Sequence, residues 1–224
     1  MNLIRRFQDL DDPQSLSSRF RRARMRRFLD MVEQVAAEKG SVRIADLGGE
    51  PGYWKHVDRA LLERCNVRIV LINPEPQSTD DPLFEVESGD ATDLSRFPDG
   101  SFDLVHSNSV VEHVGDWPRM EAFAREVRRL APRYYVQTPY FWFPIEPHFS
   151  APFFHWRSEQ SRARMLMKKR RGWVDRSDDM GEAMRAVQHA RLLDKGQFRF
   201  LFPDADHHDE KAAGLTKSLI AVRA

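Results

Sequence analysis

Short, continuous apolar runs alternate with helical patterns along the first 140 residues, and this alternation limits the possible folds most strongly. Strands that are apolar on both faces indicate a parallel sheet covered by helices, because a sheet with one wet face would alternate apolar and polar residues. A hydrophobic content of 41% in 224 residues supports a full core. Five strands are predicted at 42–47, 67–72, 83–86, 102–106 and 134–137, and two closing strands at 197–202 and 219–222, joined by an acidic turn at 204–210.

The spacing of apolar residues predicts helices over 15–38, over 53–64 and from Asp116 to about Leu130. Residues 1–40 thus contain an N-terminal basic helix, with six arginines between Arg19 and Arg27. After the fifth strand the order breaks. Residues 139–192 combine an aromatic, proline-rich stretch with a basic, helical stretch at 157–171 and a helix at 179–192. No linker divides the chain, so residues 1–224 are predicted to form one domain with an insertion, the cap (139–192), after strand five.

Charge and cysteine content exclude several classes of protein. Lys and Arg number 35 against 34 Asp and Glu, which argues against an acidic tail and against a strongly basic nucleic-acid binder. The single cysteine, Cys65, excludes a disulfide framework, a cysteine zinc cage and an iron–sulfur site within the chain. No apolar run suits a transmembrane helix or a secretory signal. We therefore expect a cytoplasmic protein and leave contact with a membrane surface open.

The most informative stretch is Asp46-Leu47-Gly48-Gly49-Glu50-Pro51-Gly52, where a strand runs into glycines and then into a helix. Glycines let the backbone approach a ligand closely, and a helix N-terminus presents free N–H groups. The stretch is not a dinucleotide fingerprint, because Glu50 and Tyr53 stand where its second and third glycines belong, and it lacks the Gly-Lys-Ser/Thr of a P-loop. It is either a ligand loop of another kind or an ordinary turn.

Three further elements follow in order. The second strand ends at Asn73, with Glu75 two residues later. The third strand is followed by Gly89-Asp90-Ala91-Thr92. The fourth strand belongs to the run Phe102–Val114, which contains Asn108 and the pair Glu112-His113. With the first loop, these four elements resemble the class I S-adenosylmethionine (SAM)-dependent methyltransferases, in particular the methyltransferase type 11 group.

The resemblance implies an α/β, Rossmann-like doubly wound fold with a mostly parallel seven-stranded sheet, an antiparallel last strand and helices on both faces. It also implies SAM as cofactor, with Asn73 at the ribose hydroxyls and Asp90 at the adenine amine. The chain departs from the family pattern at Glu50, which replaces a glycine, and at Asn73, which replaces an acid. Replacing Asp46 by alanine should abolish SAM binding without unfolding the chain. The predicted cofactor-binding residues are Asp46, Gly48, Gly49, Gly52, Asn73, Asp90, Ala91 and Asn108.

The methyl group of SAM is already activated, but an oxygen nucleophile usually also needs a base. Histidine suits this task because its pKa lies near neutrality. His113 and His148 are the predicted catalytic residues, although each could equally be structural. The aromatic stretch of the cap follows strand five, at the edge where ligands of such sheets bind. The predicted substrate contacts are therefore Tyr140, Trp142, Glu146 and His155, and no metal is predicted.

The predicted function is methyl transfer from SAM to a small molecule, at an oxygen on a glycan, lipid-linked or aromatic substrate. The basic stretch of the cap leaves an anionic acceptor open, and no nucleic-acid partner is expected. Three alternatives remain: an RNA methyltransferase, a catalytically inactive SAM-fold module that binds a partner protein, and a dinucleotide oxidoreductase. Methylation of DNA amines is disfavoured, because Asn108-Ser109-Val110-Val111 stands where that class carries Asp/Asn-Pro-Pro-Tyr/Phe.

Overall fold

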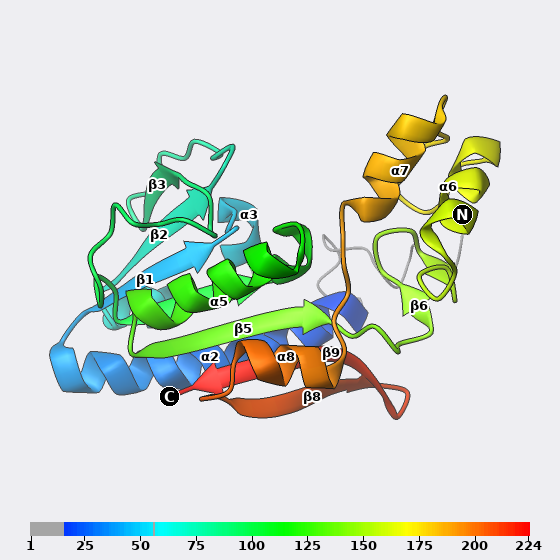
Figure 1. Ribbon diagram of the computed structural model, residues 1–224. Coiled ribbons are helices and arrows are strands. Elements are labelled where there is room, and N and C mark those ends of the chain that lie inside the picture. Colours follow the sequence, from blue (N-terminus) through cyan, green and yellow to red (C-terminus); the bar gives the residue numbers. More distant parts are fainter. Residues whose placement is uncertain (1–15, 56) are drawn as a thin grey trace.

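Seven strands form the central sheet of the computed structural model, which describes residues 16–55 and 57–224. They are β1 (Val42–Leu47), β2 (Val67–Asn73), β3 (Phe84–Ser88), β4 (Leu104–Asn108), β5 (Arg133–Pro139), β8 (Asp206–Ala212) and β9 (Leu215–Arg223). Their order across the sheet is β3-β2-β1-β4-β5-β9-β8 (Figure 1). Strands β1 to β5 are parallel, and β9 runs antiparallel to both β5 and β8. The predicted Rossmann-like sheet, mostly parallel with an antiparallel last strand, is confirmed.

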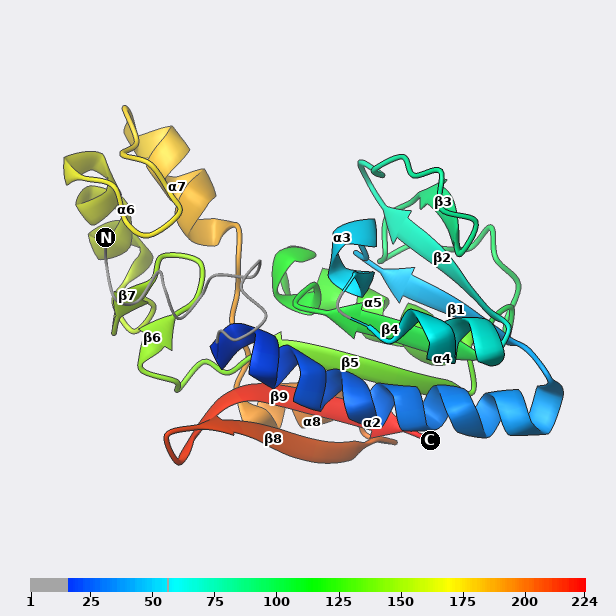
Figure 2. The same cartoon turned by 180° about the vertical axis from the view of Figure 1, so that it is seen from behind.

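Helices cover both faces of the sheet, as predicted. One face is covered by α2 (Leu16–Lys39), α3 (Pro51–Trp54) and α4 (Arg59–Arg64), and the other by α5 (Trp117–Leu130) and α8 (Lys195–Leu201). Figure 2 shows α2 lying along the sheet. Its residues Phe28, Val32 and Val35 recur at helical spacing and pack on buried β1 and β2 side chains. Of the predicted basic helix, residues 1–15 lie outside the described residues.

The helix predicted over 53–64 is divided into α3 and α4. The side chain of Asp58 accepts hydrogen bonds from the N–H groups of Ala60 and Leu61 and so caps a new helix start. Only the four residues of α3 therefore follow the glycine loop directly.

The strand predicted at 197–202 is wrong, because this segment is the helix α8. Asp194 accepts from the Gln197 N–H, and the Gln197 side chain accepts from the Asp194 N–H, so a capping box starts the helix. Phe198 and Leu201 are buried at helical spacing, and Phe200 is exposed between them.

The turn predicted at 204–210 is also wrong, because β8 begins at Asp206. Its charged residues suit a strand at the edge of the sheet, where exposed positions stay in water.

The chain leaves the sheet after β5 and returns before α8, and the residues between them stand apart from the sheet (Figure 1). They form β6 (Ile145–Glu146), β7 (Ala151–Pro152), α6 (Glu159–Lys168) and α7 (Met180–Gln188). This cap has a small core of its own, centred on Phe149, Phe154 and Leu166. Its two connections meet at the base, where the Phe141 N–H donates to the Leu193 carbonyl at 3.0 Å. Within the described residues, no helix is long and apolar enough to cross a membrane.

Gly172 lets the cap close on itself, and replacing it with alanine should loosen the cap. Its φ is +55°, and a Cβ there would overlap the carbonyl group of Phe149. We expect trypsin to cleave Gly172→Ala within the cap faster than the wild type. Gly214→Ala is the matched control: its φ is +80° with open space around it, so it adds backbone strain of about 1–3 kcal/mol without a clash. Equal cleavage of both variants would contradict the packing role of Gly172.

Candidate active site

The loop after β1 is tightly packed against its neighbours. Gly48 has φ +73°, donates its N–H to the Ile72 carbonyl at 2.8 Å, and leaves no room for a side chain beside Val110. A Cβ on Gly49 would overlap the carboxylate of Asp46, whereas Gly52 lies in open space. The first two glycines are therefore required by packing as well as by any ligand that approaches the loop.

Asp46 lies at the end of β1, is 1% exposed, and uses both carboxylate oxygens within the protein. Trp54 Nε1 donates to Oδ2 at 2.7 Å, and His106 Nδ1 donates to Oδ1 at 2.7 Å. The rings of Phe28 and Tyr135 pack against His106, with centroids 4.8 and 5.8 Å away. Asp46 thus ties β1, α3 and β4 together beneath the glycine loop.

A cavity of about 160 Å³ opens beside this network and joins the ends of β1 and β4. We call it the glycine-lined cavity. It brings together four of the predicted cofactor residues. Its lining consists of Asp46, Gly48, Gly49, Glu50, Tyr53, His106 and Asn108.

Of the remaining predicted cofactor residues, Gly52 lies in α3, Asn73 ends β2, and Asp90 and Ala91 follow β3. The Asn73 side-chain amide donates to the Gly49 carbonyl, and the Asn73 carbonyl accepts from the Gly89 N–H. Asp90 accepts from Thr92 and pairs with Arg119 at 2.6 Å. Burial works to raise the pKa of Asp90, but these hydrogen bonds and the ion pair outweigh it and hold the pKa below its ordinary value. Ala91 beside it is buried.

A second polar group, the histidine cluster, consists of Glu112, His113, Glu146 and His148. Glu112 and His113 belong to η1 (Val111–His113), a 3₁₀ turn shortly after β4, while Glu146 and His148 come from the cap. His148 Nδ1 donates to Glu146 Oε1 at 2.6 Å, and Glu146 Oε2 accepts from the Phe149 N–H. The Nε2 atoms of His148 and His113 are 3.0 Å apart.

The cluster is also tied to its surroundings. His113 Nδ1 donates to the His189 carbonyl at 3.1 Å, and Thr138 Oγ1 donates to Glu112 Oε2 at 2.9 Å. The Arg191 N–H donates to the Glu112 carbonyl at 2.7 Å. The segment that leaves the cap therefore runs against η1, and β5 lies on its other side.

The pKa values of three residues of the histidine cluster are shifted from their ordinary values. Burial raises the pKa of Glu112 to about 7. Burial, together with the neighbouring His148, lowers the pKa of His113 to about 4. For His148, burial acts to lower the pKa, but the hydrogen bond and charge of Glu146 outweigh it and raise the pKa. Shifts of this kind cluster at functional sites.

The four residues predicted to contact the substrate do not line one common site. Glu146 is buried in the histidine cluster. His155 is also buried, with Nε2 donating to the Phe141 carbonyl at 2.6 Å. Tyr140 is half-buried under the ammonium group of Lys195. Trp142 is 55% exposed and packs on Trp156 at the surface of the cap.

Several residues of these networks were not predicted as site residues, among them His106, Glu112 and Thr138. His106 and Glu112 lie within the run that carries the family resemblance. Their spacing alone gave no sign that distant partners would enclose them.

About a third of the chain matches a known family. Residues 57–133 match a family model described as a methyltransferase domain. The matched segment includes Asn73, Asp90, His106 and the pair Glu112-His113, and it ends at the start of β5. The predicted resemblance to the class I methyltransferases is confirmed.

Solved structures share the fold at low sequence identity. A possible exported protein of Bordetella parapertussis has 16% identity and a TM-score of 0.50, over 89% of this chain and 68% of that one. A Rhodobacter sphaeroides protein described as a putative zinc-dependent alcohol dehydrogenase has 12% identity and a TM-score of 0.51, over 81% and 83%. A putative methyltransferase of Haloferax volcanii, in complex with the Trm112 activator, has 15% identity and a TM-score of 0.47, over 90% and 92%. No curated protein matches the sequence significantly.

Proposed function

We propose that the chain is a SAM-dependent methyltransferase that methylates an oxygen of a small-molecule acceptor. One observation carries the proposal: the glycine-lined cavity and the histidine cluster both include residues at or shortly after the end of β4. Asn108 ends β4 and lines the cavity, and Glu112 and His113 lie in η1, which begins three residues later. A donor at the cavity and an acceptor at the cluster would meet at the carboxyl edge of the sheet, where ligands of such sheets bind.

The glycine-lined cavity is large enough for only part of SAM, and we propose that it holds the half that carries the methionine. At about 160 Å³ it is smaller than the roughly 300–1,000 Å³ typical of small-molecule sites. The adenosine half of SAM would therefore lie along the adjoining surface, near Asn73 and Asp90. When bound, SAM supplies a sulfonium methyl group that needs orientation rather than covalent help.

The proposed role of Asp46 is to position the loop rather than to contact the ligand, because both of its oxygens are already bonded. Asn73 has a similar link to the loop through its NH₂ group, and its side-chain oxygen is the atom that a ribose hydroxyl would reach. Asp90 would accept from the adenine amine with its carboxylate, beside Arg119.

On the acceptor side, Glu146 fixes the ring of His148, whose Nε2 faces Nε2 of His113. We propose that an imidazole of this pair receives the proton of the acceptor hydroxyl. Glu146 is then a positioning residue. Tyr140, at the base of the cap, and Trp142 stay proposed acceptor contacts, and the burial of His155 argues against such a role for it.

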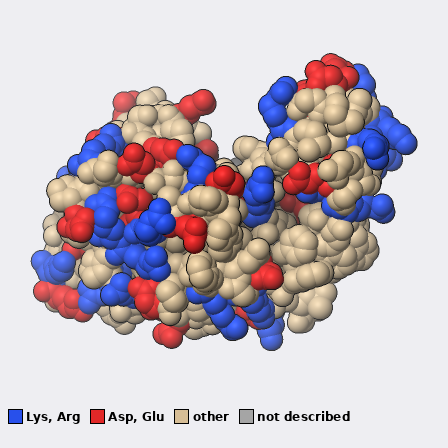
Figure 3. Space-filling model, in the orientation of Figure 1, with Lys and Arg blue, Asp and Glu red and all other residues tan. Residues whose placement is uncertain are grey.

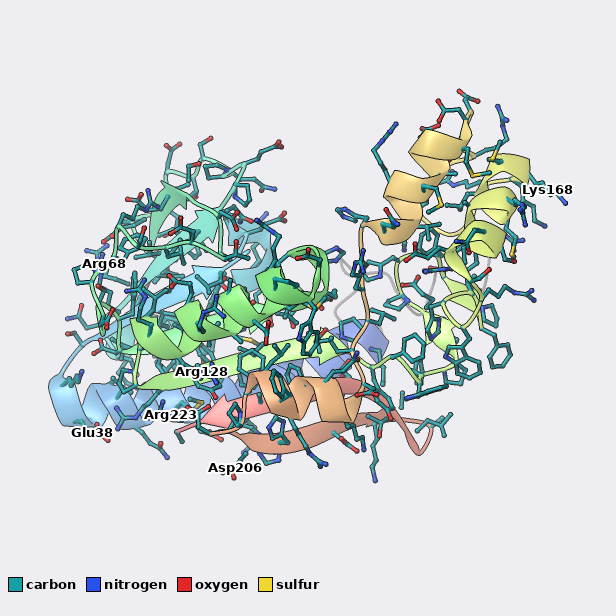
Figure 4. The ribbon with its side chains drawn as sticks, viewed as in Figure 1. Glu38, Arg68, Arg128, Lys168, Asp206 and Arg223 are labelled. Atoms are coloured by element: carbon teal, nitrogen blue, oxygen red, sulfur yellow. The ribbon has the colours of Figure 1, made fainter. Side chains whose placement is uncertain are left out.

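The surface of the cap supports an anionic acceptor or an anionic membrane surface near it. Lys168, Lys169 and Arg170 are exposed at the end of α6. Lys and Arg side chains gather on this part of the cap in Figure 3, and Lys168 points outward in Figure 4. Cationic side chains of this kind attract anionic molecules over about 8–10 Å at physiological salt.

Calorimetric titration with SAM and, separately, with NADH tests the proposal. We expect SAM to bind with a dissociation constant of roughly 1–100 μM, within the range of enzyme substrates, and NADH not to bind. Transfer of labelled methyl from SAM to hydroxyl-bearing compounds in a cell extract would then identify the acceptor. A folded protein that binds neither compound would overturn the proposal in favour of a partner-binding module, and binding of NADH alone would favour an oxidoreductase.

A further inference from the structure

We propose that Glu112, His113 and His148 together bind a divalent transition-metal ion. One ligand atom from each of the three residues lies within 4.8 Å of the other two. Two of the residues belong to η1 beside the sheet, and the third belongs to the cap. An ion here would join the cap to the sheet at the acceptor side of the proposed active site.

The two imidazoles have the arrangement of metal ligands. The Nδ1 atom of each ring donates to an oxygen that can only accept, the His189 carbonyl for His113 and the Glu146 carboxylate for His148. Both Nε2 lone pairs are therefore left facing each other, 3.0 Å apart. Two nitrogens bound at about 2.1 Å to one ion, with about 90° between the bonds, lie about 3.0 Å apart. Either a shared proton or a cation must stand between two such lone pairs.

Glu112 favours the cation. Its side chain is completely buried, and Oε2 accepts from Thr138, whereas Oε1 has no hydrogen-bond partner within the described residues. A buried carboxylate oxygen without a partner is costly, and an ion bound beside it would remove that cost.

The surroundings of the three ligands fit a metal site as well. Histidine ligands commonly donate their second N–H to a carboxylate or a backbone carbonyl, and a carboxylate ligand is itself hydrogen-bonded. Glu146, His189 and Thr138 supply these contacts. Two imidazole nitrogens and one carboxylate oxygen suit Zn²⁺, Mn²⁺, Fe²⁺ or Co²⁺ better than Mg²⁺ or Ca²⁺.

Three protein ligands leave further positions on the ion open. If the proposed methyl transfer to an oxygen holds, the acceptor hydroxyl would take one of them, and the ion would lower the pKa of that hydroxyl so that its proton leaves to water. With both Nε2 atoms bound to the ion, the ion would then take the place of the imidazole base. Binding of the ion itself does not depend on the proposed function.

Titration of the metal-free full chain with Co²⁺, followed by visible absorption, tests the site. We expect one tightly bound equivalent in the wild type and an affinity at least about tenfold weaker in Glu112→Gln and His148→Ala. Glu112→Gln keeps the shape of the side chain and an oxygen for Thr138. His208→Ala is the control for binding at surface histidines of β8 and should bind Co²⁺ as the wild type does. Wild-type affinity in folded Glu112→Gln and His148→Ala would overturn the proposal.

A second measurement does not depend on whether the variants fold. In the Co²⁺-loaded wild type, proton NMR should show two strongly shifted, exchangeable signals from the Nδ1–H groups of His113 and His148. Absence of these signals would mean that an imidazole pair sharing a proton explains the geometry. SAM titration of the same metal-free and metal-loaded samples separates this result from the proposed function, because either ligand could bind without the other.

Discussion

Asp46→Ala is expected to lower the free energy of unfolding by about 2–6 kcal/mol, because two buried donors would lose their acceptor. Asp46 accepts from both Trp54 and His106, and all three side chains are buried. Alanine would leave two buried N–H groups without acceptors, each at a cost of about 1–3 kcal/mol. The sequence alone suggests that this variant loses SAM binding and stays folded. Because Asp46 is buried and bonded, we expect the variant to lose folding stability before any effect on SAM binding can be measured.

Chemical denaturation of Asp46→Ala, Asp46→Asn and Asp99→Ala would measure this effect. Asp46→Asn keeps an oxygen for one of the two donors and should be less destabilised than Asp46→Ala. Asp99 pairs with Arg129 at the surface, its side chain is 82% exposed, and Arg129 keeps its bonds to Glu126, so Asp99→Ala should change stability by about 0–1 kcal/mol. Equal stability of Asp46→Ala and Asp99→Ala would show that the buried network contributes little.

The parallel part of the sheet could be predicted because most of its strands are short apolar runs that can be recognised from the local sequence. Apart from Arg68, residues 67–72 form a continuous aliphatic run, as expected of a strand covered on both faces. The closing segment gave no such signal. Phe198, Leu201 and Phe202 read as a short apolar strand until the capping box at Asp194 is recognised, and the charged residues of β8 read as a turn because an edge strand needs few apolar residues.

The candidate site could be predicted only where chain order fixes position. Gly48, Asn73 and Asp90 follow successive parallel strands, so they had to come to the same edge of the sheet. The contact between His113 and His148 spans 35 residues and depends on how the cap folds back on η1. No spacing in the sequence encodes that contact. The same is true of the bond between Asp46 and His106, which requires β1 and β4 to be neighbours in the sheet.

These buried contacts give the glycines of the loop a packing role in addition to the cofactor-binding role that the resemblance implies. In the resemblance, the glycines make room for a cofactor. In the structure, Gly48 and Gly49 also make room for Val110 and Asp46. The loop is therefore held in one shape by groups beneath it, and the Asn73 side chain holds it from the side. A ligand would meet a surface whose form is set before binding, which reduces the entropy lost when the ligand binds.

Gly49→Ala should therefore weaken SAM binding by at least about tenfold, a change of about 1.4 kcal/mol. Its Cβ would overlap the carboxylate of Asp46, which cannot turn away without breaking its bonds to Trp54 or His106. The loop would have to shift instead, and the cavity lining with it. Calorimetric titration with SAM measures the affinity, and thermal melting of the same samples reports any loss of stability.

Gly52→Ala provides the comparison that separates packing from ligand approach. Gly52 lies in α3 with open space around it, so alanine should leave the melting temperature unchanged or raise it slightly. If SAM affinity falls in Gly52→Ala without a lower melting temperature, the cofactor itself approaches this glycine. If Gly49→Ala binds SAM as tightly as the wild type, the loop adapts freely, and the shape imposed by Asp46 does not determine cofactor binding.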